Sequence, residues 1–445
     1  MNVARFSRIG FILAAAGSAV GLGNVWKFPY MTGESGGGAF VLIYLLTITF
    51  VGLSLFIAEV IMGRASRNDV VSAFENLAPT NKHIWKYAGL MIFTGVIILS
   101  FYLIVIGWIF KYVLISLYDL PLSVESAGAM FGGMVTTDAL NQLIFFNIAF
   151  IITMVIVAKG IKKGIEKVNL VLMPLLILIL LLLFFYSMTL SGFDDALRFL
   201  FVPDFTKVDS TTILKAVGHA FFTLSLGMGT IMTYSASMSK DTNIFKASAS
   251  VAVIDTAIAL VAGIVIFSFL FNAGAQPAGG PGLVFISLPP VFSTFGVLGN
   301  IFSFAFFIAL AFAGVTSAVS VVEPTVMYMI NRFKTTRTKA LVILGSVTYI
   351  FGTMALLSNV KEYASYVTFG GKGFFDILDF SSSSILLPLG GIIIAIFVGF
   401  VMQKESVYSV LGEYMSQRVF NLWYFSIKYI TPLGVLAVMI NKIFY

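Results

Sequence analysis

The chain of 445 residues contains no cysteine, only two histidines, and few charged residues, which make up 11% of it. Without cysteine there are no disulfide bonds and no thiolate metal sites. His83 and His219 lie far apart in the sequence, and nothing around them resembles a histidine-rich zinc site. We find no nucleophile–base pair and no cluster of metal ligands, so the sequence does not indicate an enzyme.

The residues that remain are strongly apolar. Hydrophobic side chains account for 59% of the chain, and the mean hydropathy is +1.00. Runs of about 20 apolar residues are long enough to cross a bilayer, so the composition predicts a polytopic membrane protein whose main surroundings are lipid. The net charge of +7 is better explained by basic cytoplasmic loops than by a nucleic-acid partner, and we expect none. The sequence carries no signal of oligomeric state.

Apolar segments recur along the whole chain and predict an all-α protein with eleven transmembrane helices. Their centres lie near Leu22, Thr49, Leu103, Ile148, Leu176, Thr223, Ile258, Phe312, Thr348, Ile392 and Leu436. Lysines and arginines concentrate in every second loop, whereas the loop over residues 119–140 holds only acidic charges. The positive-inside rule therefore places the N-terminus in the cytoplasm and the C-terminus outside.

Two of the predicted spans are interrupted by glycine and polar residues. The first breaks between Ser18 and Asn24, and the sixth breaks between Phe221 and Thr230. Since they are five spans apart, two consecutive five-span blocks cross the membrane in opposite senses. We expect a single domain over 1–445 with inverted repeats over about 8–190 and 211–403, and an extra helix over about 425–443.

An interrupted helix exposes backbone groups at membrane depth, where unpaired groups are costly. Free N–H groups suit a carboxylate, and free carbonyls suit an ammonium group or a small cation. Glycines in a single span could serve only close helix packing. Two interrupted spans in corresponding positions instead favour a midplane site for a zwitterion.

The motifs around these breaks resemble the neurotransmitter/sodium symporter family. "GSAVGLGNVWKFPY" (residues 17–30) is similar to the first-helix signature of the family, and "FFTLSLGMG" (221–229) is similar to its sixth-helix signature. "AGVTSAVSVVEP" (313–324) and "DFSSSSILLPLGG" (379–391) extend the resemblance through the eighth and tenth spans. Eleven spans resemble the bacterial members that lack a twelfth helix, which implies a multi-pass protein of the bacterial cytoplasmic membrane.

The resemblance implies a site for a free amino acid. Its carboxylate would meet the backbone N–H groups of Leu22 and Gly23 and the Tyr102 hydroxyl. Its ammonium group would meet oxygens of Ala19, Phe222, Thr223 and Ser225. Side-chain selectivity would come from residues Ser18, Ile98, Phe222, Met228, Ser317, Ser320 and Val321. This mixed, mainly apolar lining favours a neutral hydrophobic or aromatic side chain.

The resemblance also implies two sodium sites and no organic cofactor. The first sodium site would use Ala19, Asn24, Thr223 and Asp255. The second sodium site would use Gly17, Val20, Ala313, Thr316 and Ser317. Oxygen ligands of this kind suit a hard cation.

Asp255 is the most informative of these residues, since an unpaired aspartate at a helix centre costs about 2.5–3.5 kcal/mol. Many family members carry asparagine here, and the animal ones use chloride nearby. A permanent carboxylate predicts chloride-independent transport. Once sodium has left, the same carboxylate is a candidate for carrying a proton back outward.

Further residues match gates and supports of the family. Tyr102 and Phe222 match its lid over the substrate, and Lys27 with Asp379 matches its outer charge pair. Gly164 and Pro174 match a motif that permits local unwinding of the fifth span. Glu59 matches a structural acid that accepts bonds from the N–H groups of a broken helix. Glu323 is expected to face water near the cytoplasmic end.

Together these features predict a sodium-coupled symporter that imports a neutral amino acid by alternating access. An intramembrane enzyme and a channel are weaker alternatives, because neither a catalytic cluster nor a repeated polar pore lining is present in the sequence. An amino-acid-sensing receptor with the same fold remains an alternative, since binding residues alone do not demonstrate flux.

Overall fold

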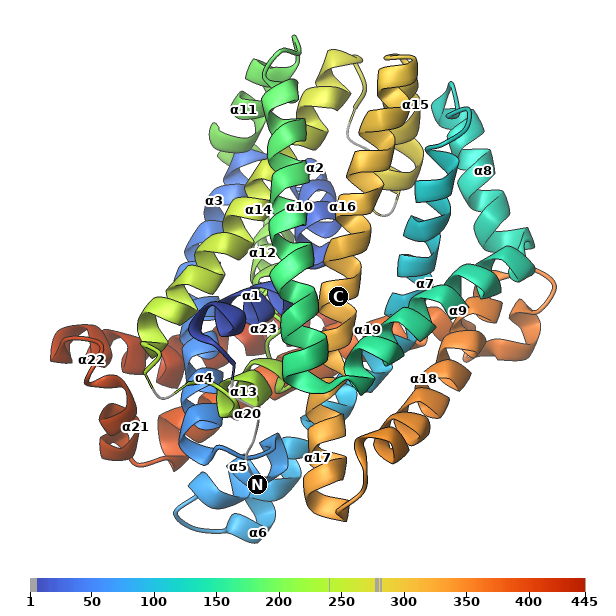
Figure 1. The fold of residues 1–445 in the computed structure, drawn as a ribbon. Helices are drawn as coiled ribbons and strands as arrows, with labels where there is room; N and C mark the ends of the chain where they lie inside the picture. Colours follow the sequence, from blue (N-terminus) through green and yellow to red (C-terminus); the bar gives the residue numbers. More distant parts are fainter. Residues whose placement is uncertain (1–5, 240, 277–279, 281, 445) are drawn as a thin grey trace.

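The computed structural model describes residues 6–239, 241–276, 280 and 282–444, which are almost entirely helical (Figure 1). Short 3-10 or π turns are labelled η. The first half consists of α1 (Arg8–Ala19), η1 (Gly23–Lys27), α2 (Phe28–Glu34), α3 (Gly38–Thr47), η2 (Ile48–Gly52), α4 (Leu53–Ser66), α5 (Val70–Leu77), α6 (Lys82–Trp85), η3 (Lys86–Ile92), α7 (Phe93–Ile115), α8 (Val124–Thr137), α9 (Ala139–Ala158), η4 (Ile161–Glu166), α10 (Lys167–Ser187), α11 (Phe193–Phe201) and η5 (Phe205–Lys207).

The second half has the same character. It consists of α12 (Ser210–Thr223), α13 (Thr230–Ala236), α14 (Ile244–Asn272), η6 (Leu283–Ser287), α15 (Leu288–Ser293), α16 (Val297–Val321), α17 (Glu323–Phe333), α18 (Arg337–Asn359), η7 (Ala364–Val367), α19 (Phe374–Phe380), η8 (Ser381–Leu386), α20 (Leu387–Ile396), η9 (Phe397–Val401), α21 (Lys404–Leu411), α22 (Gln417–Phe425), η10 (Ser426–Ile430) and α23 (Thr431–Phe444). A hairpin of β1 (Thr368–Phe369) and β2 (Lys372–Gly373) lies between η7 and α19, turning through two glycines with positive φ. This hairpin is a small departure from the all-α expectation.

Most of the predicted spans are continuous apolar helices. Within the described ranges, nine helical stretches are long and apolar enough to cross a membrane: Gly38–Ser66, Lys82–Ile115, Ala139–Ala158, Ile161–Ser187, Ile244–Asn272, Val297–Phe333, Arg337–Asn359, Phe374–Val401 and Gln417–Asn441. Arg8–Ala19 and Gly23–Glu34 form a tenth span bent by 47°. The pair α12 and α13, 14 and 7 residues long, occupies the position of the predicted sixth span. The total of eleven spans and the inverted repeat stay predictions.

The interrupted first span lies inside the bundle. Helix α1 packs against α14, α16 and α10, and η1 packs against α14. Gly17 permits this close approach, because a Cβ there would lie 1.7 Å from Asn169 Oδ1 and 3.3 Å from Thr316 Cβ. The backbone of α1 is therefore held against two neighbouring helices at the depth of its break.

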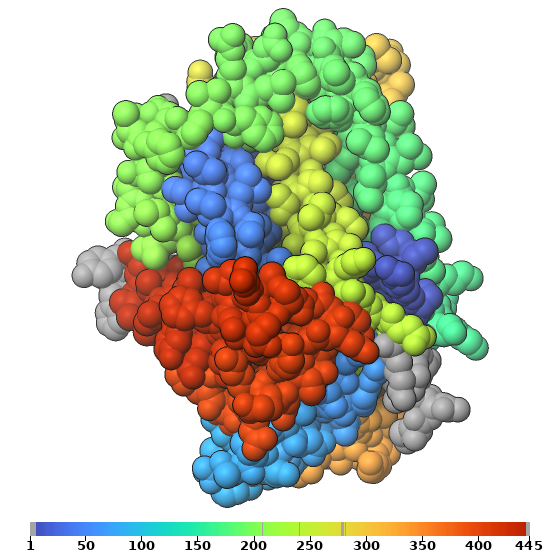
Figure 2. Space-filling model, turned by 90° about the vertical axis from the view of Figure 1, so that its left-hand side faces the viewer, coloured from blue at the N-terminus to red at the C-terminus, as the bar shows by residue number. Residues whose placement is uncertain are grey.

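The C-terminal part of the chain forms one continuous block, coloured orange to red, across the face shown in Figure 2. Within this block α23 packs against α20, and it also contacts α12 of the sixth span. Trp423 of α22 donates from its indole N–H to the Ser54 carbonyl, 3.1 Å away, which fixes the block to α4.

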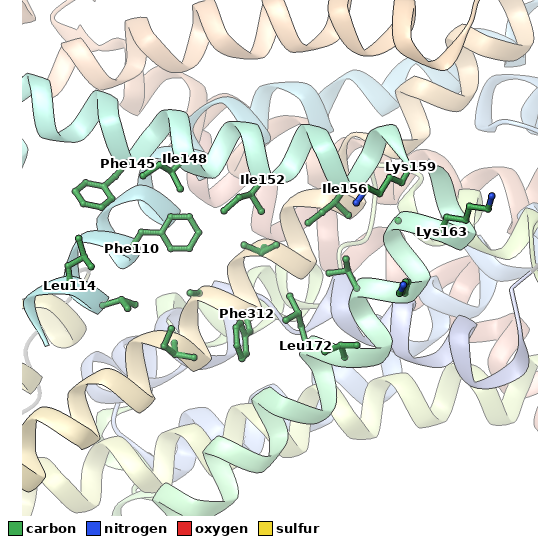
Figure 3. Close-up of a pocket in the computed structure, with 18 residues that line it drawn as sticks. Phe110, Leu114, Phe145, Ile148, Ile152, Ile156, Lys159, Lys163, Leu172 and Phe312 are labelled. Carbon is green, nitrogen blue, oxygen red and sulfur yellow. The ribbon is translucent and has the colours of Figure 1, made fainter. Parts of the chain in front are cut away.

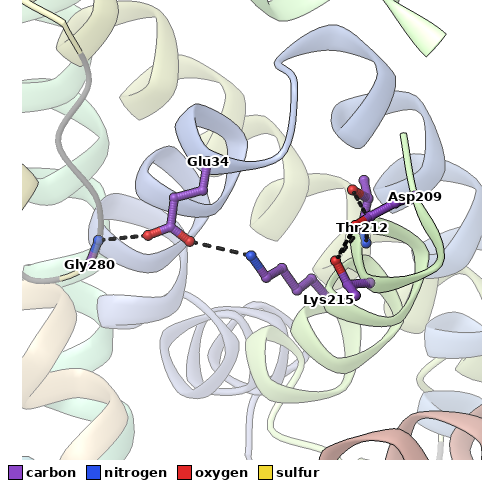
Figure 4. Close-up of polar contacts among 6 residues, drawn as sticks. Glu34, Asp209, Thr212, Lys215 and Gly280 are labelled. Carbon is purple, nitrogen blue, oxygen red and sulfur yellow. Dashed lines mark hydrogen bonds and ion pairs between the residues drawn. The ribbon is translucent and has the colours of Figure 1, made fainter. Parts of the chain in front are cut away.

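Polar contacts join the ends of elements near residues 34, 209 and 280 (Figure 4). Glu34, the last residue of α2, accepts the Gly280 N–H at 3.1 Å and pairs with Lys215 of α12 at 3.5 Å. Asp209 caps α12 by accepting the Thr212 N–H at 2.7 Å. The hydrogen bonds from Thr212 and from the Thr211 hydroxyl lower the pKa of Asp209 to about 2, so this cap is ionised at neutral pH.

The expectation that Glu323 faces water is wrong. Its carboxylate is fully buried at the start of α17 and forms an ion pair with Arg337, the first residue of α18. Arg337 also donates to the Val157 carbonyl at 2.7 Å. A guanidinium from the next helix neutralises the acid, which sequence position alone does not reveal.

Candidate functional site

The first break is narrower than the sequence suggested. Helix α1 continues through Ala19, and regular geometry is lost at Val20, where ψ is 88°, and at Gly21. The Asn24 side-chain oxygen accepts the Gly21 N–H at 3.2 Å. A side chain of the same segment thus satisfies one of the backbone donors that the break frees.

The second break lies between α12 and α13, over residues 224–229. Ser225, Gly227 and Gly229 all have positive φ, of 54°, 82° and 77°. The freed Gly227 N–H donates to a carboxylate oxygen of Glu59 at 2.9 Å, and the Met232 N–H donates to the other oxygen at 3.4 Å. Glu59, fully buried on α4, therefore lies where the family resemblance placed it, beside the broken helix.

The two broken spans meet at Ser18, in the last turn of α1. The Ser225 hydroxyl donates to the Ser18 carbonyl at 2.8 Å, and the Ser317 hydroxyl of α16 donates to the same oxygen at 3.3 Å. The Ser320 hydroxyl donates to the Ser18 hydroxyl at 2.8 Å. Main chain of the first span is thus joined to both the sixth and the eighth spans. The bond to Ser18 also accompanies the left-handed conformation of Ser225, which is unusual for a non-glycine residue.

Tyr102, in the middle of α7, reaches the first break from another direction. Its hydroxyl accepts the Leu22 N–H at 3.2 Å. These are two of the three donors proposed for the substrate carboxylate. The phenol could donate its own proton to that carboxylate while it accepts from Leu22, since a hydroxyl does both.

A narrow cavity of about 30 Å³ lies between the two breaks. Its lining consists of Ser18, Ala19, Gly21, Gly23, Ile98, Tyr102, Phe222, Thr223, Ser225, Met228, Ser317, Val321 and Leu387. Of the expected substrate residues, only Leu22 and Ser320 do not line it, although each is hydrogen-bonded to a residue that does, Leu22 to Tyr102 and Ser320 to Ser18. Gly21 and Leu387 also line it, although neither was among the expected substrate residues.

A carboxylate lies directly behind this cavity. Asp255 of α14 is fully buried and accepts from Asn24 Nδ2 at 2.7 Å and from the Thr223 hydroxyl at 3.1 Å. Asn24, Thr223 and Asp255 therefore come together from three helical segments far apart in the sequence. Ala19, the fourth residue proposed for the first sodium ion, lines the adjacent cavity.

Tyr44 of α3 joins this cluster, although it was not among the site residues predicted from the sequence. Its hydroxyl donates to Asp255 Oδ2 at 3.5 Å, and its ring centroid lies 5.3 Å from that of His219. The only available signal was a tyrosine within an apolar span, which is more often a packing residue.

The donor set of this cluster fits a sodium ion. It offers one carboxylate and the hydroxyl oxygens of Thr223 and Tyr44, and oxygen ligands of this kind suit a hard monovalent cation. The Asn24 amide oxygen accepts the Gly21 N–H here, and its nitrogen faces Asp255. Within the described part of the chain, no group of three or more His, Cys, Asp or Glu side chains could hold a metal ion.

The residues proposed for the second sodium ion lie around the middle of α1. The Thr316 hydroxyl donates to the carbonyls of Phe312, at 2.9 Å, and Ala313, at 3.1 Å, which leaves its lone pairs available to a cation. Val20 follows the last helical residue of α1, and Ser317 contacts Ser18.

Asn169 of α10 adds an oxygen that the sequence did not suggest. Its amide donates to the Ile165 carbonyl at 2.8 Å, whereas its buried Oδ1 has no hydrogen-bond partner and lies against Gly17. An asparagine just ahead of Pro174 was the only sequence signal. A buried acceptor without a donor is costly, and a cation beside Gly17 would satisfy it.

The proposed gates show one clear difference from expectation. Tyr102 and Phe222 both line the cavity. Lys27 and Asp379 do not form one of the ion pairs found among the described residues. The Lys27 ammonium instead lies 4.3 Å from the centre of the Phe222 ring. A compact ammonium group can make such a cation–π contact without any paired geometry.

The first described residues, Phe6 and Ser7, bond to segments that follow α13 and α9. The Phe6 N–H donates to the Ser237 carbonyl at 2.9 Å, and Ser7 donates to Glu166 at the end of η4 through its hydroxyl at 2.7 Å. Gly164 lies in η4 and Pro174 lies inside α10, and the helix is continuous from Ile161 to Ser187. Any unwinding of this segment would belong to another state of the protein.

Comparisons with known proteins agree with this arrangement. A model of the sodium:neurotransmitter symporter family matches residues 5–130 and 133–445. The uncharacterized sodium-dependent transporter YhdH of Bacillus subtilis is 36% identical over 98% of this chain and 97% of its own length. An uncharacterized sodium-dependent transporter of Haemophilus influenzae is 32% identical, again over 98% of this chain and 97% of its own length. The crystal structure of MhsT in complex with L-phenylalanine is similar with a TM-score of 0.89 and 42% identity, over 99% of both chains.

Proposed function

Since the chain belongs to the sodium:neurotransmitter symporter family, we propose that it imports a neutral hydrophobic or aromatic amino acid together with sodium by alternating access. Members of this family are multi-pass sodium-coupled transporters and not enzymes. The observation that carries the proposal is the junction of the two broken spans at Ser18, directly beside the Asp255 cluster. There the groups that suit a zwitterion and those that suit a cation share one small site.

The choice of substrate rests on the lining and on one relative. Ile98, Phe222, Met228, Val321 and Leu387 give the cavity an apolar side. No lysine, arginine or acidic residue is among the residues that line it, so a charged substrate side chain would stay unpaired. The similar protein MhsT has been crystallised with L-phenylalanine. We therefore propose phenylalanine and other large apolar amino acids as the preferred substrates.

We assign the two sodium ions to the two groups of oxygen ligands described above. One sodium ion would be held by Asp255, Asn24, Thr223 and the Ala19 carbonyl. The second would be held by Gly17, Val20, Ala313, Thr316 and Ser317, with Asn169 as a further oxygen. Each sodium ion that enters down a potential of 100 mV contributes about 2.3 kcal/mol. Two ions therefore suffice for accumulation of roughly a thousandfold.

Uptake of labelled L-phenylalanine into proteoliposomes with an inward sodium gradient tests this proposal. We expect accumulation in sodium and none in potassium, with competition by large apolar amino acids and not by aspartate or lysine. Sodium-dependent binding without accumulation would instead support the alternative of an amino-acid-sensing receptor. Sodium-independent binding would contradict the assignment of the ions.

Transport should not require chloride. While sodium is bound, the Asp255 carboxylate supplies a negative charge beside Tyr44 and Thr223, so no anion is needed to balance the sodium ion. We expect equal uptake when external and internal chloride are replaced by gluconate. A strict chloride requirement would show that the carboxylate does not play this part.

Asp255 is also our candidate for returning a proton outward. After sodium leaves, a buried carboxylate without a cation is costly, and protonation removes the charge. Sodium-driven uptake should then alkalinise the vesicle interior, as reported by a trapped pH-sensitive dye. An unchanged internal pH during active uptake by the wild-type protein would argue against proton exchange.

A further inference from the structure

An apolar groove of about 840 Å³ lies among α7, α9, α10 and α16 (Figure 3). None of the residues that line it also lines the amino-acid cavity. Its walls are built mainly from large apolar side chains, including Phe110, Phe145, Ile152, Ile156, Leu172 and Phe312. Four apolar lining residues, Leu114, Ile148, Ile152 and Val171, are exposed in the isolated protein, so in a bilayer the groove is open to hydrocarbon.

One end of the groove is strongly basic. Lys159, Lys163 and Lys167 all line it, and all three side chains are exposed. Figure 3 shows Lys159 and Lys163 at the end opposite Leu114 and Phe145. No described residue forms an ion pair with any of the three ammonium groups. The groove therefore combines an apolar body with a cluster of uncompensated positive charge.

The length of the apolar wall suits one leaflet of a membrane. From Phe145 to Ile156, α9 rises by about 16 Å at 1.5 Å per residue. Half of a hydrocarbon core of about 30 Å is about 15 Å. The lysines begin at the next turn, where a headgroup would lie, on the loop that the positive-inside rule assigns to the cytoplasm.

A second groove provides an internal comparison. It has a volume of about 600 Å³, lies between α9 and α18, and is lined by residues such as Phe150, Met154, Leu341 and Tyr349. No lysine or arginine is among its lining residues. Both grooves can hold an acyl chain, and only the groove with the three lysines can also select a headgroup by its charge.

We propose that the groove bounded by Lys159, Lys163 and Lys167 is a binding site for an anionic phospholipid. The phosphate would be held by the three ammonium groups, and an acyl chain would lie along the apolar wall. Basic pockets between transmembrane helices at the cytoplasmic side suit such headgroups. Because Gly164 also lines the groove, the bound lipid would contact the η4 turn that precedes α10.

Lipid retention by the purified full-length protein tests this proposal. The protein in detergent is incubated with an equimolar mixture of phosphatidylglycerol and phosphatidylcholine, separated from free lipid by gel filtration, and its retained lipid is quantified by mass spectrometry. Since each lysine near a lipid phosphate contributes about fivefold in affinity, the triple variant K159Q/K163Q/K167Q should lower phosphatidylglycerol affinity by on the order of a hundredfold. Lys162→Gln is the matched control, because Lys162 is exposed on the same turn and does not line the groove.

Two further measurements distinguish a lipid bound in the groove from a phosphate bound to the lysines alone. Ile152→Trp fills the groove without changing its charge and should also reduce phosphatidylglycerol retention. Inorganic phosphate should fail to displace the lipid, because it lacks an acyl chain. Equal retention of both lipids by the wild-type protein, unchanged retention in the triple variant or in Ile152→Trp, or displacement by inorganic phosphate would overturn the proposal. Unchanged thermal unfolding of each variant excludes loss of the fold as the cause.

Discussion

Replacing Asp255 with alanine is expected to abolish sodium-driven amino-acid uptake. The carboxylate is the only charged group in the proposed first sodium site, and it accepts hydrogen bonds from Asn24, Thr223 and Tyr44. Removing one partner of a buried charged pair costs about 3–5 kcal/mol, which corresponds to a loss of more than about a hundredfold in sodium affinity. Uptake measured against sodium concentration in proteoliposomes checks this expectation.

Two comparisons make the result specific to the sodium site. Asp255→Asn keeps the size and one acceptor oxygen but loses the charge, so it should weaken sodium binding with less damage to the packing. Asp119→Ala removes an exposed aspartate from a loop and should leave uptake unchanged. If Asp255→Ala retains wild-type sodium dependence, the first sodium ion is bound elsewhere.

Gly227→Ala should damage both the fold and the site. Gly227 has a φ of 82°, and an added Cβ would lie 2.3 Å from the Leu387 carbonyl oxygen and 3.0 Å from the Gly391 nitrogen. Both contacts are to backbone, which cannot move aside as a side chain can. A strained left-handed residue costs about 1–3 kcal/mol, and overpacking adds roughly as much.

We therefore expect a lower melting temperature and loss of uptake for Gly227→Ala. Gly132→Ala is the matched control, since a Cβ there would meet nothing within 4 Å and the residue lies within helix α8. It should unfold at the same temperature as the wild-type protein or slightly above, because alanine favours helix. Wild-type stability of Gly227→Ala would mean that the turn between α12 and α13 is not the rigid, tightly packed element described above.

Much of the site could be predicted because it is built from local backbone features. Glycines and polar residues inside an apolar run mark a break wherever they occur, so Gly21 and Gly227 were informative without any tertiary knowledge. Asp255 was informative for a similar reason, since an aspartate inside an apolar span requires a partner. The family resemblance then placed Glu59 beside the broken helix, where the Gly227 N–H now bonds it.

The features that escaped prediction depend on contacts between distant segments. Tyr44 reaches Asp255 across 211 positions of sequence, and Asn169 meets Gly17 only because α10 packs on α1. Glu323 was expected in water because its partner Arg337 begins a different helix. Periodicity and composition carry no information about which side chains meet across such packing.

The outer gate is a further place where the residue types did not predict the contact that forms. Lys27 and Asp379 match a charge pair of the family, yet the Lys27 ammonium lies over Phe222 in this structure. Residue types at matching positions fix what contacts are possible, whereas the conformation of the protein selects among them. The number of spans depends on conformation as well. Helices α12 and α13, the two halves of the broken sixth span, are 14 and 7 residues long, so neither is long enough by itself to count as a membrane-crossing helix.

Equilibrium binding of L-phenylalanine to the purified protein, with and without sodium, tests most directly whether broken main chain and Asp255 hold a zwitterion and a cation in one site. Titration in sodium chloride and in choline chloride at equal ionic strength should show affinity at least about a hundredfold higher in sodium, since the ion and the substrate share neighbouring oxygens. Equal affinity in the two salts would show that the amino acid and the ion are not coupled and would contradict the proposed site.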